Sequence, residues 1–393
     1  MKFKLSILVL SILIIIGIVL TVGITENSSD NESTEQGEQV VEQPAVDKDK
    51  VENKVEKEVL AYQEIKAELN NAKEGNAVNW EMVSNKYGAE LQASIQEIND
   101  ELNTVILAAI EAGKTGQMDA NIARQIIDKT TQSYFYQKQK ALHKLVVQAM
   151  EQGSTDEAVS TFGEIKYLAK NIFIPTATKR DGYYQIDMVS QIENGLNLQE
   201  KALSEGNVDD YSVYKQITDK TIYRSYYLAA NSYAEKIEKA AKEGEDKEEL
   251  QAEQAEGWGF LQAIKGSLAG GDEEAAKNLD RIFDLSVTDP TTINANEVND
   301  LFTKAILAKI KGYYAKAPKA LEEGNITKAK ETAMEGNVFL KAIEIDLTNK
   351  LGSEKASEVF TSAEKWFEAI SNQDIEAVEL YGSEVLEILN QLQ

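Results

Sequence analysis

The chain has 393 residues, of which 42% are hydrophobic, enough for one or two buried cores at roughly 100–200 residues per domain. Its 41 basic and 66 acidic residues give a net charge of −25, which disfavours nucleic acid and anionic lipid headgroups but permits cations and basic partners. The lack of cysteine excludes disulfides, zinc–thiolate sites and iron–sulfur clusters, and a single histidine, His143, excludes a multi-histidine metal or haem site within one chain.

Residues 5–24 form an apolar segment of twenty uncharged residues, preceded by Lys2 and Lys4. This length suits a membrane span, whereas a signal-peptide core is shorter, about 7–15 residues, and precedes a small-residue cleavage site that this sequence lacks. We therefore expect residues 1–24 to be an uncleaved signal anchor, with a cleaved signal peptide as the alternative. In both cases the lysines predict that the N-terminus faces the cytoplasm and that the rest of the chain lies outside it. The protein would be a single-pass protein of the cell membrane if the segment is retained, and secreted if it is cleaved.

Residues 25–46 are polar, acidic and almost free of large apolar side chains, so they are predicted to be a disordered acidic tether. From residue 47 onward the pattern turns helical, because apolar residues recur at spacings of three and four, as at Leu102, Val105, Ile106, Ala109 and Ile110. No alternating strand pattern is present. The fold class is therefore predicted to be all-α.

Glycines preceded by glutamate or glutamine mark the ends of the predicted helices. A glycine in the left-handed conformation ends one helix, and a new helix begins within a few residues, which produces antiparallel hairpins. The glycines with this pattern are Gly75, Gly153, Gly206, Gly244 and Gly324.

A longer repeat is also visible in the helical part. Residues 125–130, with the sequence QIIDKT, recur as QITDKT at 216–221, and a weaker copy follows at 300–305. Each copy is followed by a glutamate that begins a Glu-x3-apolar-x3-Ile pattern, at Glu164, Glu256 and Glu335. We predict tandem divergent repeats at 119–208, 209–295 and 296–393, after a more divergent helical unit at 47–118.

The three glutamates lie in line with apolar residues, an unusual position for a carboxylate. Because a buried, unpaired carboxylate is costly, each needs a cation or hydrogen-bond donors. Lysines on the preceding predicted helices, Lys129, Lys220 and Lys304, suggest structural pairs across each hairpin. The alternative is a ligand site between the helices, in which these glutamates and lysines bind a hard cation or a small molecule. The pairs Glu253–Glu256 and Glu331–Glu335 can each share a helix face, but such pairs are common in acidic helices.

Residues 172–184 break the helical pattern and bring two cations into an acidic protein. Lys179, Arg180 and Tyr183 are candidates for contact with an anion or a partner. The simpler interpretation is a connector whose cations neutralise nearby acids.

The sequence contains none of the familiar nucleotide-binding, hydrolase, zinc-protease or EF-hand patterns. We therefore expect a non-enzymatic binding protein, anchored by residues 5–24 or secreted, whose partner is an extracytoplasmic protein or small ligand and not nucleic acid. No cofactor is predicted, although a hard cation is possible. The alternatives are a cation- or small-ligand-binding protein that uses the inward glutamates and, with less support, an enzyme without a recognisable motif.

Overall fold

The computed structural model describes residues 54–392, which are helical with short connections and contain no strand. This confirms the all-α prediction. The predicted anchor at 1–24 and tether at 25–46 lie outside the described residues. Within 54–392, none of the helices combines the length and the apolar character that crossing a bilayer requires.

The first half of the described chain contains nine helices and one π-helical turn between the sixth and the seventh. They are α1 (Lys54–Lys73), α2 (Trp80–Glu90), α3 (Gln92–Ile98), α4 (Asp100–Thr115), α5 (Ala120–Glu151), α6 (Thr155–Leu168), the π-helix Ala169–Phe173, α7 (Ile174–Tyr184), α8 (Met188–Ser204) and α9 (Val208–Glu243).

The second half of the described chain contains the remaining helices and two short 3₁₀ turns. They are α10 (Lys247–Ala269), α11 (Glu273–Phe283), the 3₁₀ turn Pro290–Thr292, α12 (Ala295–Glu322), α13 (Ile326–Ala342), α14 (Glu344–Leu351), α15 (Ser353–Asn372), α16 (Ile375–Leu389) and the 3₁₀ turn Asn390–Leu392.

The helix ends follow the local chemistry of the sequence. All five glycines predicted to end helices have positive φ, between 67° and 82°, at Gly75, Gly153, Gly206, Gly244 and Gly324. Asparagine or aspartate begins many helices; Asn207, for example, accepts a hydrogen bond from the backbone N–H of Asp210 at the start of α9. The helix boundaries therefore have local causes that can be read from the sequence.

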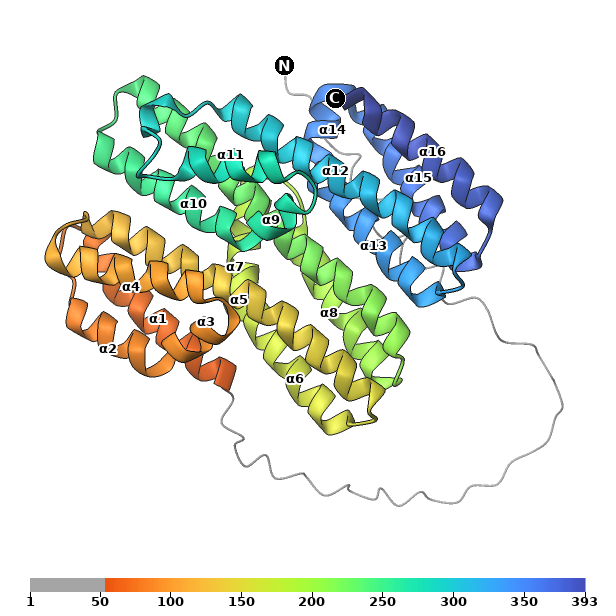
Figure 1. The fold of residues 1–393 in the computed structure, drawn as a ribbon, viewed down its shortest axis with the longest axis horizontal. Helices are drawn as coiled ribbons and strands as arrows, with labels where there is room; N and C mark the ends of the chain where they lie inside the picture. The colour runs from red at the N-terminus through yellow and green to blue at the C-terminus, as the bar shows by residue number, and fades with distance from the viewer. Residues whose placement is uncertain (1–53, 393) are drawn as a thin grey trace, which may run out of the picture. The chain divides into compact units, whose positions relative to one another are not determined.

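Three long helices, α5, α9 and α12, organise the packing (Figure 1). Each forms an antiparallel pair with a following helix: α5 with α6, α9 with α10, and α12 with α13. In addition, α10 lies against α5 and α13 lies against α9. The second helix of a pair thus contacts the long helix of the pair before it.

The middle parts of α5 and α9 are buried on every side, at residues 122–136 and 218–234. Both stretches carry hydroxyl, amide and charged side chains, many of which find partners inside the fold. Ser133 Oγ, for example, donates to the backbone oxygen of Gly259 on α10 at 2.8 Å. Polar residues on these helices therefore do not mark a solvent-exposed face.

The segment 172–184 was predicted to break the helical pattern, and this is wrong. It continues α6 through the π-helix Ala169–Phe173 into α7, with Pro175 in the first turn of α7. Pro175 has no N–H to donate to the preceding turn, and it directly follows the wider π turn, in which the Ile174 N–H bonds to the backbone oxygen of Ala169. Lys179 and Arg180 consequently lie on a helix.

A glycine in α10 sets how closely α10 approaches α5. A Cβ at Gly259 would lie 2.4 Å from the Cβ of Lys129 and 3.4 Å from its Cα, so the two helices would have to separate. We expect Gly259→Ala to lower the free energy of unfolding by about 1–3 kcal/mol, measured by urea denaturation. Gly266→Ala, on the same helix with nothing within 4 Å, is the control and should raise it by about 0.5–1 kcal/mol. Equal effects of the two substitutions would contradict the close approach.

Candidate functional site

Two buried clusters of charged residues contain four of the residues that the sequence singled out, Lys129, Lys220, Glu256 and Glu335. We name them the Asp128 cluster and the Asp219 cluster after the aspartates at their centres. Each aspartate immediately precedes a lysine of the repeated motif, Lys129 or Lys220, and each lysine reaches a glutamate on a helix much later in the chain.

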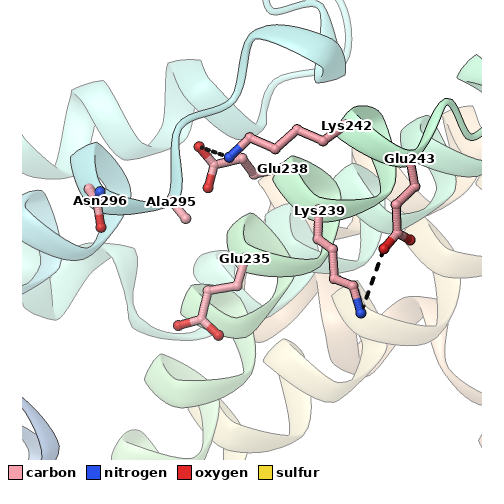
Figure 2. Close-up of a pocket in the computed structure, with 7 residues that line it drawn as sticks. All are labelled: Glu235, Glu238, Lys239, Lys242, Glu243, Ala295 and Asn296. Atoms are coloured by element: carbon pink, nitrogen blue, oxygen red, sulfur yellow. Dashed lines mark ion pairs between the residues drawn. The ribbon is translucent and has the colours of Figure 1, made fainter.

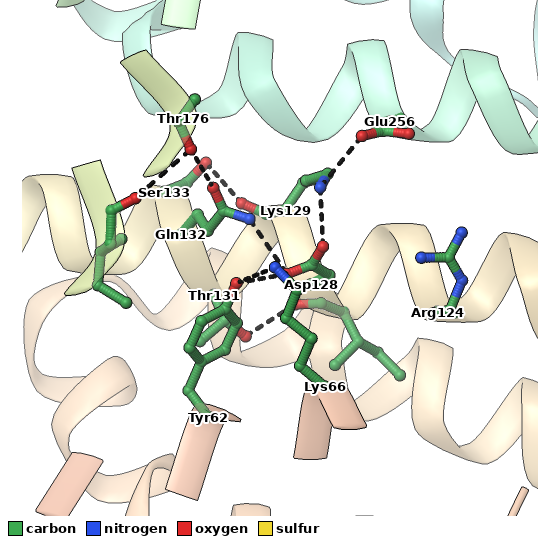
Figure 3. A network of polar contacts seen from close by, with 12 residues as sticks. Tyr62, Lys66, Arg124, Asp128, Lys129, Thr131, Gln132, Ser133, Thr176 and Glu256 are labelled. Carbon is green, nitrogen blue, oxygen red and sulfur yellow. Dashed lines mark hydrogen bonds and ion pairs between the residues drawn. The ribbon is translucent and has the colours of Figure 1, made fainter. Parts of the chain in front are cut away.

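The Asp128 cluster joins α1, α5 and α10 (Figure 3). Lys129 Nζ lies 2.8 Å from Asp128 Oδ2 and 3.1 Å from Glu256 Oε1. From α1, the Tyr62 hydroxyl donates to Asp128 Oδ1 at 2.5 Å, and Lys66 Nζ lies 3.3 Å from the same oxygen. The carboxylate of Asp128 is therefore satisfied by donors from two helices while it is almost completely buried.

The opposite charges around Asp128 and Lys129 keep both side chains ionised. Burial alone would raise the pKa of Asp128, but the charges of Lys129 and Lys66 outweigh it and hold the pKa below its usual value. Burial would likewise lower the pKa of Lys129, but Asp128 and Glu256 hold it above its usual value. The cluster is thus a stable set of ion pairs at neutral pH.

The Asp219 cluster repeats this arrangement between α9 and α13. Lys220 Nζ lies 2.5 Å from Asp219 Oδ2 and 3.0 Å from Glu335 Oε1. Tyr313 donates to Glu335 Oε1 at 2.6 Å, as Tyr233 hydrogen-bonds to Glu256 in the other cluster.

The aromatic neighbours of the two lysines also correspond. Lys129 Nζ lies 5.1 Å from the ring centre of Phe260, and Lys220 Nζ lies 5.6 Å from that of Phe339. In both clusters the glutamate and the aromatic residue belong to a Glu-Gly-x-x-Phe sequence, at 256–260 and 335–339.

The predicted pairing across each hairpin is wrong. Lys129 pairs with Glu256 and not with Glu164, and Lys220 pairs with Glu335 and not with Glu256. The reason is that α10 and α13 pack against the preceding long helix as well as their own. Each lysine therefore meets the glutamate of the next predicted repeat.

The remaining predicted pair members have other neighbours. Lys304 is exposed on α12 and lies 2.9 Å from Asp272 Oδ2. Glu164 is half-buried; burial raises its pKa, which Lys138 partly opposes. Lys138 itself binds the buried carboxylate of Glu58 at 2.5 Å.

The two members of each acidic pair, Glu253–Glu256 and Glu331–Glu335, have different surroundings. Glu331 lies 3.0 Å from Lys215, whereas Glu335 lies 3.0 Å from Lys220. Glu253 has a buried Oε2 without a hydrogen-bond partner among residues 54–392.

Across the same residues, no three His, Cys, Asp or Glu side chains are grouped so that they could hold a metal ion.

The cations of α7 lie beside the Asp128 cluster. Burial lowers the pKa of Lys179, and the nearby charges of Lys129 and Lys66 lower it further. Arg180 donates to Ser232 Oγ at 3.2 Å, while Tyr183 is 58% exposed and packs edge-on against Tyr184. The structure thus brings Lys179 near Lys129 and Glu256, places Arg180 against Ser232 on α9, and leaves Tyr183 on the surface.

Sequence reasoning missed Asp128, Asp219 and Tyr62 as parts of these clusters. The two aspartates were detectable, because an Asp-Lys pair occurs in both clear copies of the repeated motif. Tyr62 lies on α1, outside the repeats, and no local pattern connects it to residue 128.

The hydroxyl of Tyr62 is expected to contribute measurably to stability. Tyr62→Phe removes a donor to a buried carboxylate, so the free energy of unfolding should fall by about 1.5–3 kcal/mol in urea denaturation. Tyr381→Phe, on α16, is the matched control and should change it by less than about 0.5 kcal/mol. A loss no larger than that of the control would show that Asp128 does not depend on this hydrogen bond.

A shallow groove of about 490 Å³ lies at the end of α9 and the start of α12 (Figure 2). Glu235, Glu238 and Glu243 line it together with Lys239, Lys242, Ala295 and Asn296. Its ion pairs, Lys242–Glu238 at 3.3 Å and Lys239–Glu243 at 3.9 Å, connect neighbouring turns of one helix. None of the clustered lysines or glutamates lines this groove.

Comparisons of the chain with protein-family models, with curated proteins and with solved structures find no match.

Proposed function

We propose that this chain is a non-enzymatic extracytoplasmic binding protein made of tandem divergent helical units. The units are those predicted at 119–208, 209–295 and 296–393, after the divergent unit at 47–118. The apolar segment 5–24, with Lys2 and Lys4 before it, supports a membrane anchor, and 25–46 supports a tether that extends the helical part away from the membrane.

The observation that carries this proposal is the way the recurring carboxylates are used. Glu256 is held by Lys129 from α5 and by a tyrosine, and Glu335 is held by Lys220 from α9 and by a tyrosine. A carboxylate with these partners has little capacity left for a ligand, whereas a pair that joins helices far apart in sequence fixes how they pack. The repeated residues therefore serve the architecture, and partner binding belongs to the surface.

The groove at the end of α9 is a suitable partner surface. It lies where the predicted second and third units meet, and it carries three glutamates against two lysines. With a net charge of −25, the chain favours a partner with basic groups.

Native mass spectrometry with elemental analysis tests this proposal. The full chain is purified in mild detergent from its own host, and its native and denatured masses are compared with those of Glu256→Gln combined with Glu335→Gln. We expect both the natural chain and the double variant to retain the same protein partner in the native spectrum, provided that the double variant is folded. A stoichiometric metal or small ligand that is lost with both glutamates would instead establish the rival ligand-binding function.

Protease treatment of intact host cells tests the location. Residues 54–392 should be degraded from outside the cell, whereas full protection of an expressed chain would contradict an extracytoplasmic position.

A further inference from the structure

We infer that the groove at the end of α9 takes an arginine side chain of the protein partner, whose guanidinium group binds the carboxylate of Glu235 and the amide oxygen of Asn231. This inference rests on the proposed function and adds to it the chemistry by which the partner is recognised. It is carried by a row of polar residues between α9 and α12 that ends at the groove.

The row begins deep in the fold, at Asp346 on α14. Tyr227 on α9 and Thr303 on α12 both donate to Asp346 Oδ2, at 3.2 Å and 3.1 Å. Four residues further along α9 and four residues back along α12, Asn231 Nδ2 donates to Asn299 Oδ1 at 3.0 Å. The two helices are therefore antiparallel here, and their facing residues change by one helical turn at each step.

The next step along both helices is the groove itself (Figure 2). Glu235, four residues after Asn231, and Ala295, four residues before Asn299, both line it. Ala295 has no polar side-chain atom to offer, and among residues 54–392 Glu235 makes no ion pair. The other two glutamates of the groove each pair with a lysine of their own helix. Glu235 is thus the groove carboxylate that is left for a partner.

The direction of the hydrogen bonds in the row is fixed by Asp346. Its carboxylate can only accept, so the Asn299 Nδ2 group must donate to Asp346 Oδ1, which it does at 3.0 Å. The Asn299 oxygen then faces Asn231, which must donate in turn. The oxygen of Asn231 is consequently left on the side of its amide that faces away from Asn299.

This last oxygen of the row has no donor. Asn231 is only 6% exposed, and its Oδ1 is buried without a hydrogen-bond partner among the residues that the structure describes. A buried acceptor without a donor costs free energy. A ligand that brings an N–H group past Glu235 would remove this cost.

The charges at this end of the groove favour a cation. Asp346 is 7% exposed, and within residues 54–392 its partners are neutral donors and it makes no ion pair. Partial burial raises the pKa of Glu235, and the charge of Asp346 raises it further. Two carboxylates therefore lie near one another without a cation, and a positive group between α9 and α12 would be attracted by both.

The arrangement of the two acceptors suits arginine better than lysine. The carboxylate of Glu235 is at the groove wall, whereas the oxygen of Asn231 lies one helical turn further in, about 5.4 Å along the helix axis. A guanidinium group is flat and has five N–H donors in a fixed fork, so it can donate to both acceptors at once. An ammonium group is compact and strongly hydrated, and it would serve mainly Glu235.

Peptide binding to the full chain in mild detergent tests the inference. Fluorescence anisotropy measures the affinity of a labelled, capped Gly-Arg-Gly-Arg-Gly peptide and of the same peptide with lysine or with citrulline, a neutral analogue of arginine. We expect the arginine peptide to bind several-fold more tightly than the lysine peptide and the citrulline peptide to bind most weakly. Equal affinities of the arginine and lysine peptides would overturn the inference.

A pair of variants separates the groove from the general negative charge of the protein. Glu235→Gln should weaken binding of the arginine peptide about five- to tenfold. Glu358→Gln, at an exposed position of α15, changes the net charge equally and should leave the affinity within about twofold. Equal losses in the two variants would overturn the inference. Thermal unfolding checks that both are folded, and the comparison of peptides on the natural chain does not depend on either.

Native mass spectrometry of Glu235→Gln distinguishes this inference from the proposed function. If the natural chain and Glu235→Gln retain a protein partner equally, the groove is not the arginine site, while the proposed binding function stands. If the natural chain retains no partner, the proposed function fails, and the peptide affinities alone decide whether the groove recognises arginine.

Discussion

Lys220→Met is expected to lower the free energy of unfolding by about 3–5 kcal/mol, because it leaves two carboxylates without their cation. Lys220 and Asp219 are nearly buried, and the side chain of Glu335 is only 18% exposed. Water therefore cannot replace the lost ion pairs. Urea denaturation at pH 7 measures the effect.

An exposed lysine provides the control. Lys304→Met removes an ion pair with Asp272 in which the lysine side chain is 57% exposed, so the expected loss is at most about 1 kcal/mol. Lys129→Met should resemble Lys220→Met, because Lys129 bridges Asp128 and Glu256 in the same way. Similar small losses for all three variants would show that the buried clusters do not hold the helices together.

Neutralising the stranded acids should recover much of the stability. Combining Lys220→Met with Asp219→Asn and Glu335→Gln removes all three charges, so the penalty for isolated buried charge disappears. If the triple variant is as unstable as Lys220→Met alone, the loss comes from packing of the lysine stem and not from charge.

The helix ends of this protein were predictable because their causes are local. A glycine in the left-handed conformation stops a helix through its own backbone, so each of the five predicted positions could be inferred from a few neighbouring residues. The all-helical fold class followed from the same short-range spacing of apolar residues.

The partners of Lys129 and Lys220 were not predictable from the repeat. Glu164 follows Lys129 at nearly the same sequence separation as Glu256 follows Lys220, because both pairs occupy equivalent positions in the repeat. Pairing within one unit (Lys129 with Glu164) and pairing with the next unit (Lys129 with Glu256) therefore fit the repeat equally well. Packing decides between them, because α10 and α13 each lie against two long helices. This register depends on contacts between residues more than 100 positions apart.

Burial of the repeated motif was the other feature that was not predicted. The motif around Asp128 contains charged and hydroxyl residues, yet neighbouring helices bury it almost completely. Because its partners include Tyr62 from α1, the motif becomes interior only when the whole fold is assembled.

Lowering the pH from 7 to 4 is expected to remove about 3 kcal/mol of stability through His143 alone. The ring is 4% exposed, and its Nδ1 lies 3.0 Å from the Tyr211 hydroxyl, while Nε2 is buried without a partner among the described residues. Burial lowers the pKa of His143 to about 4, against an ordinary value of 6.5; Asp219 opposes the shift, and Lys215 and Lys220 add to it.

Because the folded-state pKa of His143 lies below the unfolded value, the unfolded chain binds the extra proton first. The contribution is therefore fully present above pH 6.5 and is lost as the pH falls toward 4. His143→Gln keeps a side chain able to hydrogen-bond to Tyr211 but does not titrate. Urea denaturation of both proteins across this range isolates the histidine, since acids such as Glu164 titrate in both. If the difference in unfolding free energy between the two proteins does not change with pH, His143 is not buried in its neutral form.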